Sequence, residues 1–186
     1  MKTYKGRWRP IFVLGIDRSG TSLLSEVVVN WGAHPGAAEK LAPADAQNPQ
    51  GYWEYLPMQD FVAALIASVG VSTWEPDFMA RVRERAFEPS WRDQALALAA
   101  EMERPDRPWL WKEPAIALTL SFWQEIVEDV VFLITLRNPV DSAASFKKFF
   151  LPSALREKFE IDGFFFLKWQ HYMLSTFGTL ASHQRV

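Results

Sequence analysis

The chain has 186 residues, 49% of them hydrophobic, and it carries a formal net charge of −2. This length predicts one domain over residues 1–186 with a substantial core, and the charge argues against a nucleic-acid binder that relies on bulk positive charge. Cysteine is absent, which excludes disulfides and thiolate metal sites, and the three histidines show no metal-ligand spacing. Any anion-binding site must therefore be built locally.

In chain order, the first predicted element is a strand buried on both faces over residues 11–16, where an apolar run contains β-branched residues. The run is too short for a membrane span, and no signal-peptide cleavage site follows it. We therefore expect a cytoplasmic protein without a membrane span. A glycine loop at residues 15–20 and a helix over residues 21–31 come next.

The middle of the chain is predicted to form a long loop followed by two helices. Residues 33–57 are rich in Pro, Gly, Ala, Asn and Gln, and a loop of this length is usually functional. Helices are predicted over residues 58–69 and 91–102. Residues 71–89 between them are ambiguous, although their alternating Arg and Glu side chains indicate a solvated helical face.

The second half of the chain repeats the alternation of strands and helices. A short strand is predicted over residues 109–112, a helix over residues 116–127, and a second strongly apolar strand over residues 130–136, which read VVFLITL. Helices over residues 140–150 and 162–180 follow. This order predicts a three-layer α/β fold with a mainly parallel sheet flanked by helices.

The glycine loop reads GIDRSGTS, which nearly matches the phosphate-binding pattern G-x-x-x-x-G-K-[ST], with Thr21 in place of the lysine. A helix N-terminus after such a loop offers unpaired N–H groups and a positive dipole to an anion. Arg18 adds a fixed cation, Gly20 lets the backbone approach closely, and Ser19, Thr21 and Ser22 add hydroxyl donors. The loop therefore predicts a phosphate or sulfate site, unless it is only a turn that opens a helix.

A second polar stretch, RNPVDSAAS, follows the second strong strand. Arg137 lies where α/β sheets place their ligands, at the carboxyl end of a predicted parallel strand. Ser145 is about two helical turns further along, so its hydroxyl can return toward Arg137. The stretch indicates a second anion site, and the alternative is a surface arginine before an amphipathic helix.

Together the two stretches resemble the sulfotransferase family that uses 3′-phosphoadenosine-5′-phosphosulfate, in its bacterial-type members. RSGTSLL resembles the family's 5′-phosphosulfate loop, and RNPVDSAAS resembles its R-x-P-x-x-x-x-x-S motif for the 3′-phosphate. The resemblance implies a P-loop NTPase-like sulfotransferase fold in which residues 18–22 hold the 5′-phosphosulfate and Arg137 and Ser145 hold the 3′-phosphate. Two shorter stretches, WKEPA and NPQGYWE, also resemble family segments.

The resemblance implies transfer of a sulfuryl group to a hydroxyl or amine of a small molecule, glycan or lipid, without a metal ion. Arg18 and Lys112 are then the cations that stabilise charge on the leaving phosphate. The acceptor proton needs a general base, and several family branches use a glutamate after the phosphosulfate loop. Glu54 is our first choice for this base and Glu39 the second; His34 is expected to be a loop residue.

Aromatic residues are abundant, and they divide into two expected groups. Trp53, Tyr55 and Trp74 are the candidates to shape an acceptor site. An aromatic stripe usually means packing, so a core position is expected for the others, namely Trp109, Trp111, Phe164, Phe165, Phe166 and Trp169.

The chain departs from the family pattern near its C-terminus, where it has no counterpart of a glycine-rich basic segment. It therefore resembles a short family member, which leaves three interpretations open: a minimal enzyme, a homo-oligomer that completes its site between copies, and a non-catalytic nucleotide-binding relative. A P-loop nucleotide kinase is a weaker alternative, because the lysine is absent and the RNPVDSAAS stretch is present.

Overall fold

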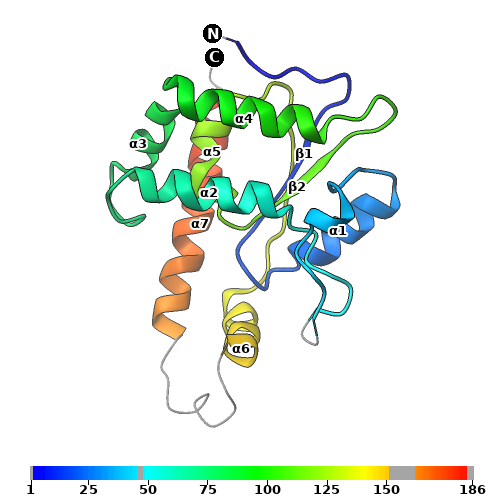
Figure 1. The fold of residues 1–186 in the computed structure, drawn as a ribbon. Coiled ribbons are helices and arrows are strands. Elements are labelled where there is room, and N and C mark those ends of the chain that lie inside the picture. Colours follow the sequence, from blue (N-terminus) through cyan, green and yellow to red (C-terminus); the bar gives the residue numbers. More distant parts are fainter. Residues whose placement is uncertain (1, 46–47, 151–161, 184–186) are drawn as a thin grey trace.

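Three parallel strands form the sheet of the computed structural model, which describes residues 2–45, 48–150 and 162–183. The strands β1 (Ile11–Leu14), β2 (Leu110–Lys112) and β3 (Val131–Ile134) lie in the order β2-β1-β3 (Figure 1). Both neighbours pair with β1 in parallel, so the carboxyl ends of all three strands meet at one edge. This arrangement confirms the predicted α/β class with a parallel sheet.

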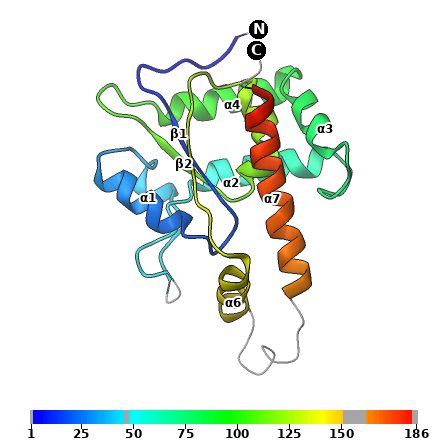
Figure 2. The same ribbon diagram turned by 180° about the vertical axis from the view of Figure 1, so that it is seen from behind.

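Helices cover both faces of this sheet, as the two opposite views show (Figures 1 and 2). One face is covered by α1, whereas α2, α4, α5 and α7 lie on the other. No helix in the described part of the chain combines the length and apolarity that a membrane crossing requires. The helices are α1 (Thr21–Asn30), α2 (Leu56–Ser68), α3 (Phe78–Arg85), α4 (Pro89–Met102), α5 (Ile116–Gln124), α6 (Pro139–Phe150) and α7 (Asp162–His183).

The central strand supplies both halves of the core, because successive strand residues point to opposite faces. Phe12 and Leu14 belong to the large core on the side of α2, α4, α5 and α7, whereas Val13 packs with Val28 of α1. The Phe12 and Trp111 rings are 5.3 Å apart in the larger core. The expected core position of Trp111 is thereby confirmed.

One expectation about the core is wrong, and it concerns the aromatic run at the start of α7. Phe165 is fully buried, but Phe164 and Phe166 are 57% and 38% exposed. Successive residues of a helix lie about 100° apart around its axis, so three consecutive aromatic side chains cannot all face one core. Trp169, one turn further on, is only half-buried.

The predicted loop over residues 33–57 contains backbone pairings and one short 3-10 helix, η1 (Ala38–Lys40). His34 pairs in parallel with Trp109 next to β2, and Leu41 pairs with Tyr55 in the antiparallel sense. The loop therefore runs from the end of α1 past the start of β2, turns, and leads into α2, with Glu54 beside Lys112 at the carboxyl end of β2. This path positions the stretch that carries Glu54.

Candidate active site

The glycine loop of residues 15–20, which joins β1 to α1 and is called the anion loop below, has a backbone that only glycine suits at two positions. Gly15 has φ of 150°, and a Cβ there would lie 2.2 Å from the Thr135 hydroxyl oxygen, just beyond β3. Gly20 has φ of 101° at the N-terminus of α1, a left-handed conformation that other residues adopt at a cost. The two glycines therefore let the loop turn closely against the end of β3 and open directly into α1.

Ser19 holds this loop together through its side chain. Its hydroxyl donates to the Ile16 carbonyl oxygen at 2.6 Å and lies 2.7 Å from the Thr135 hydroxyl. The side chain is buried and belongs to neither cavity described below. Of the three hydroxyl residues predicted to face an anion, only Thr21 and Ser22 line the open space.

The two sequence motifs meet at Arg18, although 127 positions separate it from Ser145. Arg18 Nε donates to Ser145 Oγ at 3.1 Å, and its guanidinium carbon lies 4.3 Å from the centre of the Phe149 ring. Arg137 Nη1 donates to the Arg18 carbonyl oxygen at 3.0 Å. Ser145 and Arg137 were expected to approach each other, and the structure brings both to Arg18 instead.

Two cavities adjoin at the N-terminus of α1, and they share Arg18, Thr21 and Ser22. The Lys112 cavity, of about 150 Å³, is also lined by Glu54 and Lys112. The Arg137 cavity, of about 220 Å³, is also lined by Gly20 and Arg137. Cations, hydroxyls and a helix N-terminus in adjoining spaces suit a ligand with two anionic groups.

Glu54 and Lys112 form an ion pair inside the first of these cavities. Lys112 is the last residue of β2 and Glu54 comes just before α2; the Lys112 ammonium contacts Glu54 Oε1. Only 3% of the lysine side chain and 13% of the glutamate side chain are exposed. Gln59 Nε2 donates to the second oxygen, Glu54 Oε2, at 3.3 Å. Both carboxylate oxygens of Glu54 are therefore held in place.

A second carboxyl group, Glu113, lies behind this pair and was not singled out from the sequence. Its Oε2 accepts from Gln59 Nε2 at 3.2 Å, and its Oε1 accepts from the Ala115 backbone N–H at 3.2 Å. Burial, followed by the negative charge of Glu54, raises the pKa of Glu113 to about 7. One amide side chain thus connects the two carboxyl groups.

The raised pKa of Glu113 predicts a specific loss of stability with pH. The folded chain holds this proton up to about pH 7, whereas the unfolded chain releases it near pH 4.5, so the free energy of unfolding falls as the pH rises between these values. The fall from pH 5 to pH 8 is about 2 to 3 kcal/mol. Urea unfolding of Glu113→Gln should lack this fall. Glu39→Gln, the same change at an exposed site, should keep it, and identical slopes for all three proteins would contradict the assignment.

Four of the residues considered for the acceptor side line neither of the two cavities. Glu39 is exposed on η1 and lines neither of them. None of the three aromatic residues expected there lines them either: Tyr55 is buried with its hydroxyl bonded to α4, Trp74 stacks on α7, and Trp53 is absent from their walls. The aromatic wall of the Lys112 cavity consists of Tyr52 from the long loop and a phenylalanine from α6.

The last helix, α7, also reaches the site. Lys168 Nζ lies 2.5 Å from Asp17 Oδ2, one position before Arg18 in the anion loop. Tyr172, one turn further along, is buried, and this burial together with the charges of Asp17 and Glu113 raises its pKa. Across the described residues, no group of three or more His, Asp or Glu side chains is arranged to hold a metal ion.

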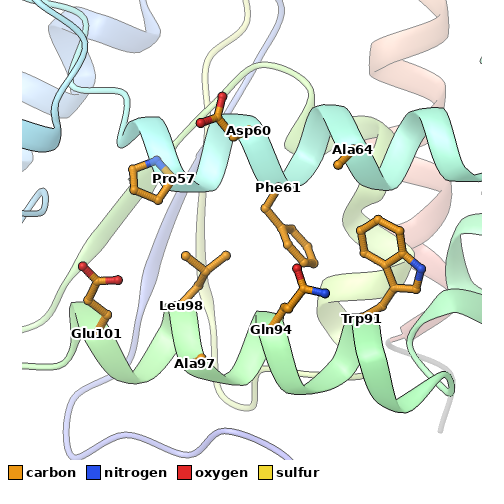
Figure 3. A pocket seen from close by; sticks show the side chains of 9 residues that line it. All are labelled: Pro57, Asp60, Phe61, Ala64, Trp91, Gln94, Ala97, Leu98 and Glu101. Atoms are coloured by element: carbon orange, nitrogen blue, oxygen red, sulfur yellow. The ribbon is translucent and has the colours of Figure 1, made fainter.

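A further cavity of about 460 Å³ lies between α2 and α4, away from the anion loop (Figure 3). Its walls are mainly apolar, and Phe61, Trp91 and Leu98 point into the space between the two helices. Asp60 and Glu101 at its edge are the charged residues among those that line it. Among the described residues that line this cavity there is no Lys, Arg or His, which distinguishes it from the site described above.

Comparison with known proteins identifies the family to which the residues of this site belong. No curated protein and no solved structure matches the chain. A protein-family model described as "Sulfotransferase family" matches residues 10–177, a span that contains the anion loop, the Glu54–Lys112 pair and the Arg137 stretch. The chain therefore belongs to the sulfotransferase family.

Proposed function

We propose that this protein transfers a sulfuryl group from 3′-phosphoadenosine-5′-phosphosulfate to a hydroxyl or amine of an acceptor. One observation carries the proposal: a single cavity at the N-terminus of α1 is lined by Arg18, Lys112 and Glu54. Two of these side chains are cations suited to an anionic donor, and the third is a carboxylate suited to take the acceptor proton. Thr21 in place of a lysine fits a donor other than a nucleoside triphosphate.

The donor-binding role is divided between the two cavities. In this proposal the N-terminus of α1, with Thr21 and Ser22, holds the 5′-phosphosulfate, because its N–H groups and hydroxyls donate to anionic oxygens. Arg137 holds the 3′-phosphate, since only one of its N–H groups is needed for the Arg18 carbonyl. Ser145 contributes indirectly, because its hydroxyl accepts a hydrogen bond from Arg18 and so holds the Arg18 side chain in position.

The reaction needs one proton acceptor and positive charge at the leaving oxygen. The donor supplies the sulfuryl group; a new bond forms from the acceptor oxygen or nitrogen to sulfur while the bond from sulfur to the phosphate oxygen breaks. Glu54 accepts the proton that the acceptor loses. Lys112 and Arg18 stabilise the electron pair left on the phosphate oxygen, and fixed charges of this kind are often the largest catalytic contribution.

Calorimetric titration tests the donor assignment with 3′-phosphoadenosine-5′-phosphate, 5′-AMP and ATP with Mg²⁺. We expect the bisphosphate to bind about 10- to 100-fold more tightly than 5′-AMP, because charge-assisted hydrogen bonds to a phosphate are worth about 1.5–3 kcal/mol. Arg137→Ala should remove this difference and leave 5′-AMP binding unchanged. Arg107→Ala, which removes an exposed arginine paired with its neighbour Asp106, is the matched control.

The same titration, together with an assay of sulfuryl transfer, separates the proposal from its alternatives. Equal or tighter binding of ATP with Mg²⁺ would indicate a phosphotransferase. Normal binding of the bisphosphate without sulfuryl transfer to any acceptor tested would indicate a nucleotide-binding relative that does not catalyse transfer. Absence of binding by all three nucleotides would contradict the donor assignment.

A further inference from the structure

The anion loop contains an acidic residue, which by itself opposes the binding of an anion. Asp17 comes directly before Arg18 and lines the Lys112 cavity together with Glu54. Two carboxylates in the wall of one cavity repel an anionic ligand, because charges in a partly buried site interact more strongly than in water. The proposed donor therefore binds well only if both negative charges are compensated.

Each of the two carboxylates has a lysine partner, and the two lysines come from different parts of the chain. Glu54 pairs with Lys112 of β2 inside the cavity. Asp17 pairs with Lys168 of α7, whose ammonium nitrogen lies 2.5 Å from Asp17 Oδ2; the side chains of Lys168 and Asp17 are 20% and 27% exposed. Lys168 lines neither the Lys112 cavity nor the Arg137 cavity. It therefore affects a ligand there through Asp17 and not by contact.

The packing of α7 holds Lys168 beside the anion loop. This helix packs against α5 and α6 (Figure 2). The Lys168 ammonium nitrogen lies 5.6 Å from the centre of the Phe146 ring on α6 and 5.4 Å from the centre of the Tyr172 ring, one turn further along α7. Aromatic faces at such distances attract a cation. The positive charge is thus fixed next to Asp17 by contacts from two helices.

The positive charge that this arrangement leaves for a ligand is that of Arg18. Within the described part of the chain Arg18 forms no ion pair; its guanidinium donates to the Ser145 hydroxyl and lies over the Phe149 ring. Without Lys168, the carboxylate of the adjacent residue, Asp17, would oppose the charge of Arg18 in the same cavity.

On the basis of the function proposed above, we propose that Lys168 is a positioning residue for donor binding, which pairs with Asp17 and so leaves the charge of Arg18 to attract the 5′-phosphosulfate. The alternative is a pair with a structural role alone, which fastens α7 to the anion loop. The two roles predict different results for Asp17. Loss of either partner breaks a structural pair, whereas only loss of the lysine makes the cavity more negative.

Calorimetric titration with 3′-phosphoadenosine-5′-phosphate compares the wild type with Lys168→Met, Asp17→Asn and the double variant. We expect Lys168→Met to bind about tenfold more weakly, which is the size of effect expected from one uncompensated unit charge at a partly buried site. Asp17→Asn should bind at least as tightly as the wild type. The double variant should return to within about threefold of the wild type, because both charges are then removed. Lys40→Met, which breaks the more exposed pair with Glu101, is the matched control and should not change the affinity.

Thermal unfolding of each variant shows whether it is folded before its affinity is interpreted. Three results would overturn the inference: unchanged affinity in Lys168→Met, a loss in Asp17→Asn as large as that in Lys168→Met, and no recovery in the double variant. If Lys168→Met does not fold, Asp17→Asn decides alone. Binding at or above the wild-type affinity supports charge compensation, and weaker binding contradicts it.

Titration of the same proteins with pyrophosphate separates this inference from the proposed function. Pyrophosphate is an anion that can bind the anion loop without an adenosine group. If the wild type binds pyrophosphate but not the bisphosphate, the donor assignment fails, and the order of the variants with pyrophosphate still decides the role of Lys168. If the wild type binds neither, both the donor assignment and the inference are contradicted.

Discussion

Replacing Glu54 by glutamine is expected to lower the rate of sulfuryl transfer by about 10²–10⁴-fold and to leave the affinity for 3′-phosphoadenosine-5′-phosphate unchanged. The amide keeps the size of the side chain, and its oxygen can still accept a hydrogen bond, but it cannot take the acceptor proton. The donor groups, Arg18 and the N-terminus of α1, are not altered. The measurements are turnover with labelled donor and calorimetric affinity for the bisphosphate.

Two controls separate a lost base from a damaged site. Lys112 is almost fully buried and loses its charged partner in Glu54→Gln, so thermal unfolding must show that the variant still folds. Glu39→Gln carries the same chemical change on an exposed turn of the same loop and should transfer sulfuryl groups at near the wild-type rate. Near-normal turnover of Glu54→Gln, or a large loss of turnover in Glu39→Gln, would contradict the assignment of Glu54 as the general base.

The sequence was informative wherever a local pattern has one structural solution. The apolar runs at residues 11–16 and 130–136 are too continuous for surface strands, and both became strands of the parallel sheet. The first strand is shorter than expected, because Gly15 turns away with a backbone that does not continue a ladder. The helix start at Thr21 was found from the loop before it, since glycine followed by hydroxyl residues opens a helix.

The parts of the site that escaped prediction depend on partners distant in the chain. Gln59 looks like an ordinary polar residue near the start of a helix, and only the fold shows that it connects Glu54 with Glu113. The rings of Tyr52 and Phe149 both line the Lys112 cavity and lie 6.5 Å apart, although the two residues are about a hundred positions apart in the chain. No local pattern specifies such a meeting, and the sequence therefore could not show which aromatic residues line the Lys112 cavity.

The fold supports the proposed reaction because it brings charged side chains from several segments to one edge of the sheet, and no single motif does this alone. The anion loop and the Arg137 stretch are placed at one edge because parallel strands end there together. The long loop brings Glu54 to the same edge, where it contacts Lys112, the last residue of β2. Glu54 therefore lines the same cavity as Arg18 and Lys112, where the proposed reaction needs a proton acceptor.

Replacing Arg18 by lysine is expected to weaken binding of 3′-phosphoadenosine-5′-phosphate by about 10- to 100-fold, although the positive charge is kept. Lysine cannot donate to Ser145 in the same geometry, and it cannot lie flat on the Phe149 ring as the guanidinium does. Residue 18 has φ of 66°, and arginine and lysine bear the same cost in that conformation. A loss of affinity would therefore reflect the lost hydrogen bond to Ser145 and the lost stacking on Phe149, and not a change in backbone strain at residue 18.

A double-mutant cycle shows whether the loss of nucleotide affinity in Arg18→Lys is caused by loss of the hydrogen bond between Arg18 and Ser145. Calorimetric affinities are compared for Arg18→Lys, Ser145→Ala and the double variant, with Arg107→Lys as an exposed control. If Ser145 acts by orienting the arginine, the double variant binds no more weakly than Arg18→Lys alone. Independent losses would mean that Ser145 contacts the nucleotide itself. An Arg18→Lys affinity within twofold of wild type would show that this residue acts only as a point charge, and the donor site would then rest on Arg137 and the N-terminus of α1.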